Sequence, residues 1–214
     1  MDSSAGTDTT VLSMSAARGA RPGAGDRSPR IELAAGSLCL DFLATAEAMR
    51  RHRPDLLGST EDFKSWLAGP SLPCPAGGLS EQDLASARRL RAGIDALLRA
   101  IISGGAASAD DVQCVNSFAR YPTPVFFLRP GGRVSALVEE ADISASLAVI
   151  ARDTIHLVAD SDLARLRECA RDGCSTLFFD RSPSGRRRWC AMKGCGEIVA
   201  SASYRRRRSR GAPE

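Results

Sequence analysis

The chain has 214 residues, of which 43% are hydrophobic and 25% are charged, and its formal net charge is +4. These are the values of a globular protein that can bury a core, so they exclude a wholly disordered chain. No apolar run approaches the roughly 18 residues needed to cross a bilayer, and no secretory signal opens the sequence, so a soluble cytoplasmic protein without membrane contact is expected.

The N-terminal residues differ in composition from everything that follows. Residues 1–29 are mostly small and polar and have no periodic apolar face, so they are expected to form a disordered tail. The folded part opens within residues 31–53. The apolar, Ala-rich sequence there predicts a helix that ends before Pro54.

Three further helices are predicted from their N-terminal capping signals. Ser59 or Thr60 precedes two acidic residues and an apolar stripe, Ser80 precedes the clearest helix of the chain, and Ser108 starts another. The helix after Ser80 carries one continuous apolar stripe, formed by Leu84, Ala87, Leu90, Ile94, Leu97, Leu98 and Ile101.

The middle of the chain contains one β-prone stretch. Two short runs flank the Pro-Gly-Gly sequence at 130–132, which predicts a β-hairpin. Helical periodicity returns from residue 142, and Asp160 or Ser161 is expected to cap a final helix that leads to Cys169. The sequence therefore predicts a mainly α domain with one β-hairpin over residues 30–164.

Four of the seven cysteines stand in two pairs with the same spacing. Four residues separate Cys169 from Cys174, fifteen follow, and four separate Cys190 from Cys195. Two short turns that each present two thiolates supply the tetrahedral set of soft ligands that structural zinc prefers. Because all four positions are Cys, no ligand position stays open for a catalytic water. No nucleophile–base pair or phosphate-binding loop occurs elsewhere, so no enzymatic activity is expected.

Three other uses of these cysteines compete with zinc. A cytoplasmic location disfavours two disulfides, and a redox dithiol has two residues between its cysteines rather than four. An iron–sulfur cluster also takes four thiolates and stays open as an alternative, although paired turns suit zinc better. One structural Zn²⁺ is the prediction.

The residues around the cysteines predict the architecture of the metal module. Gly173 and Gly194 each precede the second cysteine of a pair and can adopt the positive φ of a tight turn. Residues 175–180 and 186–190 have the composition of two strands around a turn, and a helix can follow the second pair. This order is that of a small treble-clef-like zinc module with four cysteine ligands.

Basic residues gather in the same module, residues 165–210. The segment contains 13 Lys/Arg against 4 Asp/Glu, so it carries +9 and the rest of the chain carries −5. A basic end on a mildly acidic body favours a polyanionic partner such as DNA. Trp189 is expected to pack over the zinc core. The arginines expected to contact DNA phosphates are Arg186, Arg187, Arg188, Arg205, Arg206, Arg207 and Arg208.

One set of residues in this module matches a known zinc finger: Cys169, Cys174, residues 178–182, residues 186–190, Cys195 and Gly196. On these residues the module resembles the CGNR zinc-finger family. The upstream sequence "LCLDFLAT" at 38–45 and the later hairpin resemble the helical ABATE domain that accompanies this finger. The resemblance implies a stress-induced transcription regulator that uses its zinc module on DNA.

Two departures from the family pattern bear on function. The family's Asn-Arg after Cys-Gly is Glu197-Ile198 here, and the basic charge that normally follows is delayed to 205–208. The family's usual Asn in the first-helix signature is Ala44. These departures keep open a second hypothesis, in which the zinc module binds a protein partner and the helical domain senses a small-molecule effector.

Overall fold

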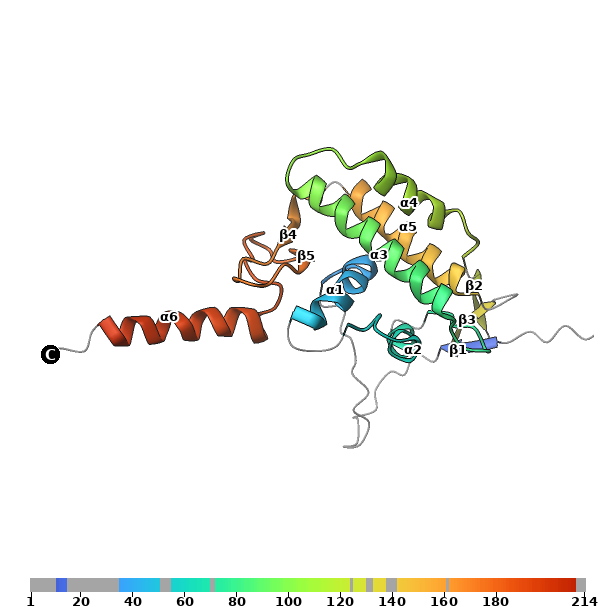
Figure 1. Cartoon of the computed structure of the whole chain (residues 1–214), viewed down its shortest axis with the longest axis horizontal. Helices are drawn as coiled ribbons and strands as arrows, with labels where there is room; N and C mark the ends of the chain where they lie inside the picture. The colour runs from blue at the N-terminus through green and yellow to red at the C-terminus, as the bar shows by residue number, and fades with distance from the viewer. Residues whose placement is uncertain are drawn as a thin grey trace, which may run out of the picture.

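The computed structural model describes residues 11–14, 35–50, 55–69, 72–123, 125–129, 133–137, 142–160 and 162–210. In this part of the chain most residues are helical, and a small C-terminal module lies between the helical body and a projecting last helix (Figure 1). The helices are α1 (Leu38–Arg50), α2 (Thr60–Ala68), α3 (Glu81–Ile102), α4 (Ala109–Ala119), α5 (Ile143–Ala159) and α6 (Glu197–Arg210). None of them is both long and apolar enough to span a membrane.

The predicted capping serines start their helices. The hydroxyls of Ser59, Ser80 and Ser108 accept hydrogen bonds from backbone amides three residues later, at 3.1, 3.2 and 3.1 Å. Each bond satisfies one of the amides that a helix leaves without a partner in its first turn. Asp142 caps α5 in the same manner, through the amide of Ser144 at 3.2 Å. The predicted starts of α2, α3 and α4 are therefore confirmed.

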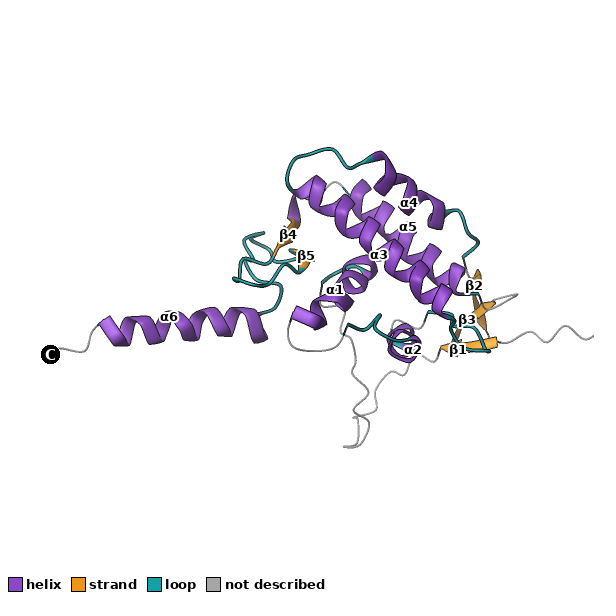
Figure 2. Ribbon diagram, in the orientation of Figure 1, coloured by secondary structure: helices purple, strands orange, loops and turns teal. Residues whose placement is uncertain are grey.

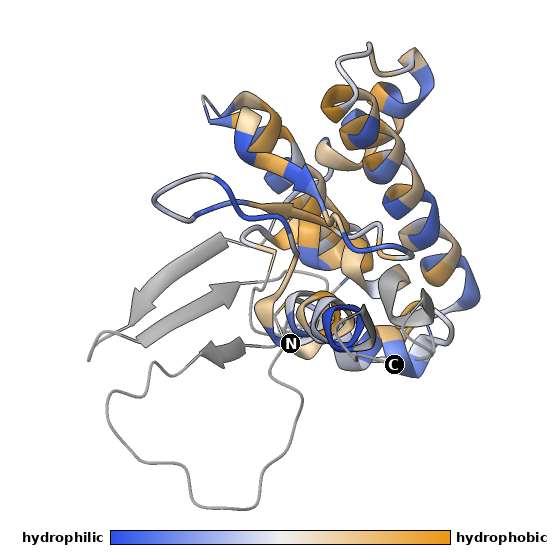
Figure 3. Cartoon of the chain, turned by 90° about the vertical axis from the view of Figure 1, so that its left-hand side faces the viewer, coloured by the Kyte–Doolittle hydropathy of each residue, from blue (hydrophilic) through white to orange (hydrophobic). Residues whose placement is uncertain are grey.

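The core lies where α3, α4 and α5 pack together and α1 closes one side (Figure 1). The stripe predicted on α3 is buried from Leu84 to Leu98, and Ile101 is partly buried at its end. Hydrophilic and hydrophobic segments alternate along the helices, as amphipathic packing requires (Figure 3). Cys39 and Cys114, outside the metal cluster, are buried in this core.

The predicted hairpin is present and has a third strand. Strands β2 (Val125–Arg129) and β3 (Arg133–Leu137) pair antiparallel, and β1 (Val11–Met14) pairs with the other edge of β3 (Figure 2). The expectation of a disordered tail over 1–29 is therefore wrong for 11–14, because a short apolar run there completes the ladder of β3. The rest of that tail lies outside the described residues.

The connection from α5 to the metal module also differs from the prediction. A final helix was expected before Cys169, but the chain forms one 3₁₀ turn (Leu163–Arg165) and then strand β4 (Leu166–Glu168). Strand β4 pairs antiparallel with β5 (Leu177–Phe179). The apolar Leu166 is buried in this short sheet, and backbone pairing with β5 replaces the expected helical bonds.

Two carboxylates, Asp153 of α5 and the buried Asp41 of α1, lie near the start of α1. Asp153 of α5 accepts hydrogen bonds from the Ser37 hydroxyl and the Cys39 amide, both at 2.8 Å. Nearby, Asp41 is only 4% exposed; its Oδ1 accepts a bond from the Ala35 amide at 3.2 Å and its Oδ2 has no hydrogen-bond partner. Burial raises the pKa of Asp41 to about 6, against the lowering effect of the Ala35 amide, and the Asp153 carboxylate adds to the rise.

Replacing Asp41 by asparagine is expected to stabilise the protein more at high pH than at low pH. The pKa of Asp41 in the folded state lies above the unfolded value of 3.8, so ionisation of Asp41 lowers the free energy of unfolding. This cost is complete above about pH 6 and decreases progressively toward pH 4. The advantage of the D41N variant in urea unfolding should therefore be about 1 kcal/mol larger at pH 8 than at pH 5. An equal D41N effect at pH 5 and at pH 8 would contradict the assignment.

Candidate metal centre and nucleic-acid interface

The four paired cysteines meet in one buried cluster. Cys169 and Cys174 lie in the turn between β4 and β5, and Cys190 and Cys195 lie in the turn that leads into α6. All four are no more than 7% exposed, and their sulfur atoms lie within 4.8 Å of one another. The Sγ–Sγ separations are 3.9 Å for Cys174–Cys190, 3.6 Å for Cys190–Cys195 and 3.7 Å for Cys195–Cys174.

These separations fit one tetrahedral ion. Thiolates that bind zinc at about 2.3 Å in a tetrahedron lie about 3.8 Å from one another. A disulfide requires sulfurs about 2.05 Å apart, and none of the four cysteines forms one. A multi-iron cluster spreads its thiolates over several metal ions, whereas this set surrounds the space of one. The four cysteines therefore fit a single structural zinc ion, as predicted.

Both turns use the predicted glycines. Gly173 has φ +74° and Gly194 has φ +104°, the left-handed region that costs residues with a Cβ roughly 1–2 kcal/mol. The Cys174 amide donates to the Arg171 carbonyl at 2.9 Å, and the Gly196 amide donates to the Ala191 carbonyl at 3.1 Å. These bonds close each turn so that its two sulfurs face the same point.

The thiols have opposed protonation preferences in the absence of a cation. Burial raises the pKa of the Cys174 thiol, but hydrogen bonds from the hydroxyl and amide of Thr176 outweigh burial and lower it to about 6; the hydroxyl lies 3.2 Å from the sulfur. Burial, together with the adjacent cysteines, raises the pKa of Cys190 to about 12. Four thiolates therefore coexist here only beside a cation, and zinc binding must release protons.

One charged side chain supports the cluster directly. The Arg171 guanidinium hydrogen-bonds the sulfurs of Cys174 and Cys195, while its buried Nε has no hydrogen-bond partner. Four thiolates around Zn²⁺ carry a net charge of −2, which this guanidinium offsets in part. Sequence reasoning missed Arg171. Its position between the two cysteines of the first turn is the signal that could have found it.

Residues 186–190 were expected to pair as a strand with 175–180, and this prediction is wrong. Their backbone groups bond elsewhere: the Arg187 amide donates to the buried Asp180 carboxylate at 2.8 Å, and the Arg188 carbonyl accepts from the Ala170 amide at 2.8 Å. Asp180 also accepts from the Ser182 amide at 2.9 Å. The buried carboxylate thus folds the connection between the two turns, a role that the sequence did not reveal.

The seven arginines predicted to contact DNA divide into two groups. The Arg187 side chain bonds the carbonyls of Trp189 and Cys190, and its guanidinium lies 4.9 Å from the centre of the Phe178 ring. It therefore holds the fold of the finger. Trp189 packs against the core, as predicted, with Arg188 over its ring at 5.5 Å. The exposed arginines are Arg186, Arg188, Arg205, Arg206, Arg207 and Arg208.

The finger is joined to the helical body by a polar seam and a shared core. The Phe179 amide donates to the Ala35 carbonyl at 2.9 Å, and the Arg181 guanidinium donates to the Gly36 carbonyl. Arg99 of α3 pairs with Glu168 at 3.1 Å and donates to the carbonyl of Ser175 at 2.8 Å. The seam fixes the orientation of the finger on α1 and α3. The finger side chains that belong to the buried core of the body are Leu166, Leu177 and Phe178.

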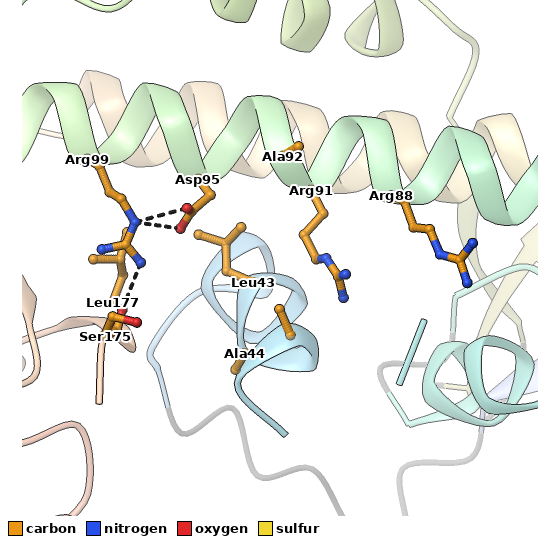
Figure 4. A pocket seen from close by; sticks show the side chains of 10 residues that line it. Leu43, Ala44, Arg88, Arg91, Ala92, Asp95, Arg99, Ser175 and Leu177 are labelled. Atoms are coloured by element: carbon orange, nitrogen blue, oxygen red, sulfur yellow. Dashed lines mark hydrogen bonds and ion pairs between the residues drawn. The ribbon is translucent and has the colours of Figure 1, made fainter. Parts of the chain in front are cut away.

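A cavity of about 170 Å³ opens along this seam, with three arginines on its α3 side (Figure 4). Arg91 forms a bidentate pair with Asp55 at 2.6 Å, and Arg99 pairs with Asp95 at 2.9 Å. Arg88 donates to backbone carbonyls just before α2. Arg88 and Arg91 thus join α3 to the segment before α2, and Arg99 joins α3 to the finger. Ala44, the departure from the first-helix signature, also lines this cavity.

The closed four-cysteine centre and the helix that follows it define a zinc finger, and the CGNR zinc finger family matches residues 165–208. The family named ABATE, described as "Putative stress-induced transcription regulator", matches residues 36–161. That match covers more than half of the chain, and the chain belongs to this family. No curated protein matches the chain. The predicted resemblance to both families is confirmed.

Proposed function

We propose that the protein is a zinc-dependent, DNA-binding transcription regulator of the stress-response type, acting in the cytoplasm and without enzymatic activity. The observation that carries the proposal is the position of Arg205, Arg206, Arg207 and Arg208. They are exposed on α6, a helix that starts directly at the metal centre and contacts η2, the turn of Met192–Gly196 that contains Cys195 (Figure 1). The zinc centre would fix the start of this helix, and the helix would carry the charge to DNA.

The arrangement of the four arginines favours a groove over a flat surface. Successive residues of an α-helix are rotated by about 100°, so residues 205–208 surround the helix with positive charge. A flat anionic surface would contact only one side of such a helix. The major groove of DNA is about 12 Å wide, admits a helix and has phosphates along both edges. Contacts of this kind position the protein without reading the base sequence.

Glu197 weakens this interface less than its sequence position suggests. It is the first residue of α6, where an acidic side chain stabilises a helix through the helix dipole. At 1.5 Å per residue it lies about 12–17 Å along the axis from residues 205–208. This distance exceeds the Debye length of about 8 Å at physiological salt, so its repulsion of the phosphates near those arginines is largely screened.

The proposal is tested by the salt dependence of binding to a 30-base-pair duplex. If four arginines each neutralise one phosphate, the log–log slope of affinity against salt concentration should be about −3.6, and affinity should fall roughly 150-fold between 50 and 200 mM salt. Fluorescence anisotropy with a labelled duplex measures the affinity at each salt concentration and therefore the slope. An affinity that stays constant over this range would refute the proposal.

A second candidate function is binding of a protein partner by the finger. Large apolar side chains are exposed in the turn before α6 and along the helix itself: Met192 is 63% exposed, Ile198 51% and Tyr204 56%. Exposed apolar surface is typical of interaction sites. A protein complex that survives nuclease treatment and is lost in the I198E variant would favour this function over DNA binding.

A further inference from the structure

A second cavity lies in the helical body, away from the metal centre. It has a volume of about 330 Å³ and opens between the C-terminal halves of α3 and α5 and the helix α4. Its inner wall includes the buried Leu97 and Val115. At its rim, Val112 is 39% exposed and Ile155 is 42% exposed.

The chemistry of the lining selects an uncharged ligand. None of the described residues that line the cavity is charged, and Asn116 supplies the only side-chain amide. Thr154 also lines it, but its hydroxyl already donates to the Ile150 carbonyl at 3.0 Å. A charged compound would lose its hydration here without gaining a partner, whereas an apolar compound would cover the exposed Val112 and Ile155.

The size of the cavity selects a small molecule over a protein segment. A cavity of about 150 Å³ holds benzene, so 330 Å³ corresponds to roughly a dozen non-hydrogen atoms. Two turns of a partner helix, about 10 Å wide and 11 Å long, fill roughly 900 Å³, so the cavity can enclose a few side chains of such a helix but not the helix itself. Ligand-binding pockets begin at about 300 Å³.

We propose that this cavity binds a small, uncharged, largely apolar organic compound of bicyclic aromatic size, with Asn116 forming its one polar contact. The site adjoins the supports of the finger. On α3, Leu97 and Ile101 line the cavity, while Arg99 on the opposite face holds Glu168 and the Ser175 carbonyl. Binding in the cavity does not depend on the proposed DNA function, so the two proposals can fail separately.

The test uses the full chain with indole and naphthalen-2-ol as probes, measured by isothermal titration calorimetry. Native protein should bind at least one probe with a stoichiometry of one. Two variants should weaken that binding by about tenfold or more: I155E places a charge at the rim, and A159W fills the cavity without adding charge. Both positions are exposed, and circular dichroism verifies that the helices persist.

The matched control is I198E, the same substitution at an exposed isoleucine on α6, which should retain native affinity. Naphthalene-2-carboxylate should bind at least tenfold more weakly than naphthalen-2-ol, because the lining offers its charge no partner. The proposal is overturned if neither probe binds at 1 mM, if I155E and A159W bind as well as the native protein, or if the carboxylate binds as tightly as the alcohol.

Discussion

The C190S variant is expected to lose its zinc and the ordered structure of the finger. Serine offers no thiolate, so the remaining three sulfurs leave the tetrahedral set of Cys169, Cys174, Cys190 and Cys195 incomplete. Structural zinc contributes on the order of 10 kcal/mol to the folding of zinc-finger peptides, and a segment as short as 165–210 cannot replace that energy with buried apolar surface. Metal analysis should show a fall from one zinc per chain to a small fraction of it, and amide exchange should show lost protection between residues 169 and 196.

The control for this variant is C74S. Cys74 is half-buried and lies outside the cluster, so the same chemical change there should leave zinc content and finger protection unchanged. A chelator added to native protein should reproduce the effect of C190S. A C190S protein that keeps stoichiometric zinc, or a finger that stays protected after chelation, would show that the four sulfurs do not hold the metal.

Unfolding of the finger should also destabilise the helical body. Leu166, Leu177 and Phe178 of the finger are buried in the same core as α1 and α3, and Phe178 is fully buried. When the finger unfolds, these side chains leave that core and the contacts of Arg99 across the seam are lost. The C190S variant should therefore melt at a lower temperature throughout, and the decrease in the helical signal measures this coupling.

The features that the sequence predicted are those set by neighbouring residues. A serine three residues before an acid determines where a helix begins, and this relation held at Ser59, Ser80 and Ser108. The cysteines of each pair are separated by four residues, the last of which is a glycine, and this local pattern determines a tight turn. The metal cluster could therefore be predicted from the sequence. The apolar stripe of α3 likewise gave its buried face.

The features that were missed depend on partners distant in sequence. Strand β4 forms because β5, eleven residues further on, offers it a ladder, while the local sequence favoured a helix. In the sequence, Arg187 cannot be distinguished from Arg186 and Arg188. Only the fold shows that the Phe178 ring and the carbonyls of Trp189 and Cys190 surround its guanidinium. The residues next to Asp180 in the sequence do not indicate that its carboxylate is buried. An arginine-rich segment therefore contained both structural and solvent-facing charges, and composition could not separate them.

The double variant R205A/R207A is expected to reduce DNA affinity strongly and to flatten its salt dependence. Both arginines are exposed on α6 and far from the zinc cluster, so their removal should leave the metal centre intact. Each phosphate contact contributes about 0.9 to the log–log slope, so the slope should become shallower by about 1.8. If the native protein and the variant bind equally at 1 M salt, the variant should bind roughly 60-fold more weakly than the native protein at 0.1 M.

The charge-matched control is R89A/R120A, which removes two exposed arginines from α3 and the end of α4. Net charge falls by two in both proteins, so a general effect of charge would weaken them equally. Contact through α6 predicts that only R205A/R207A changes the slope, while zinc content stays at one per chain in both. If the two variants lose affinity to the same extent, DNA is attracted by the whole molecule and α6 is not its binding element. If R205A/R207A binds as the native protein does, the arginines that matter are those beside the zinc centre, Arg186 and Arg188, and α6 has another partner.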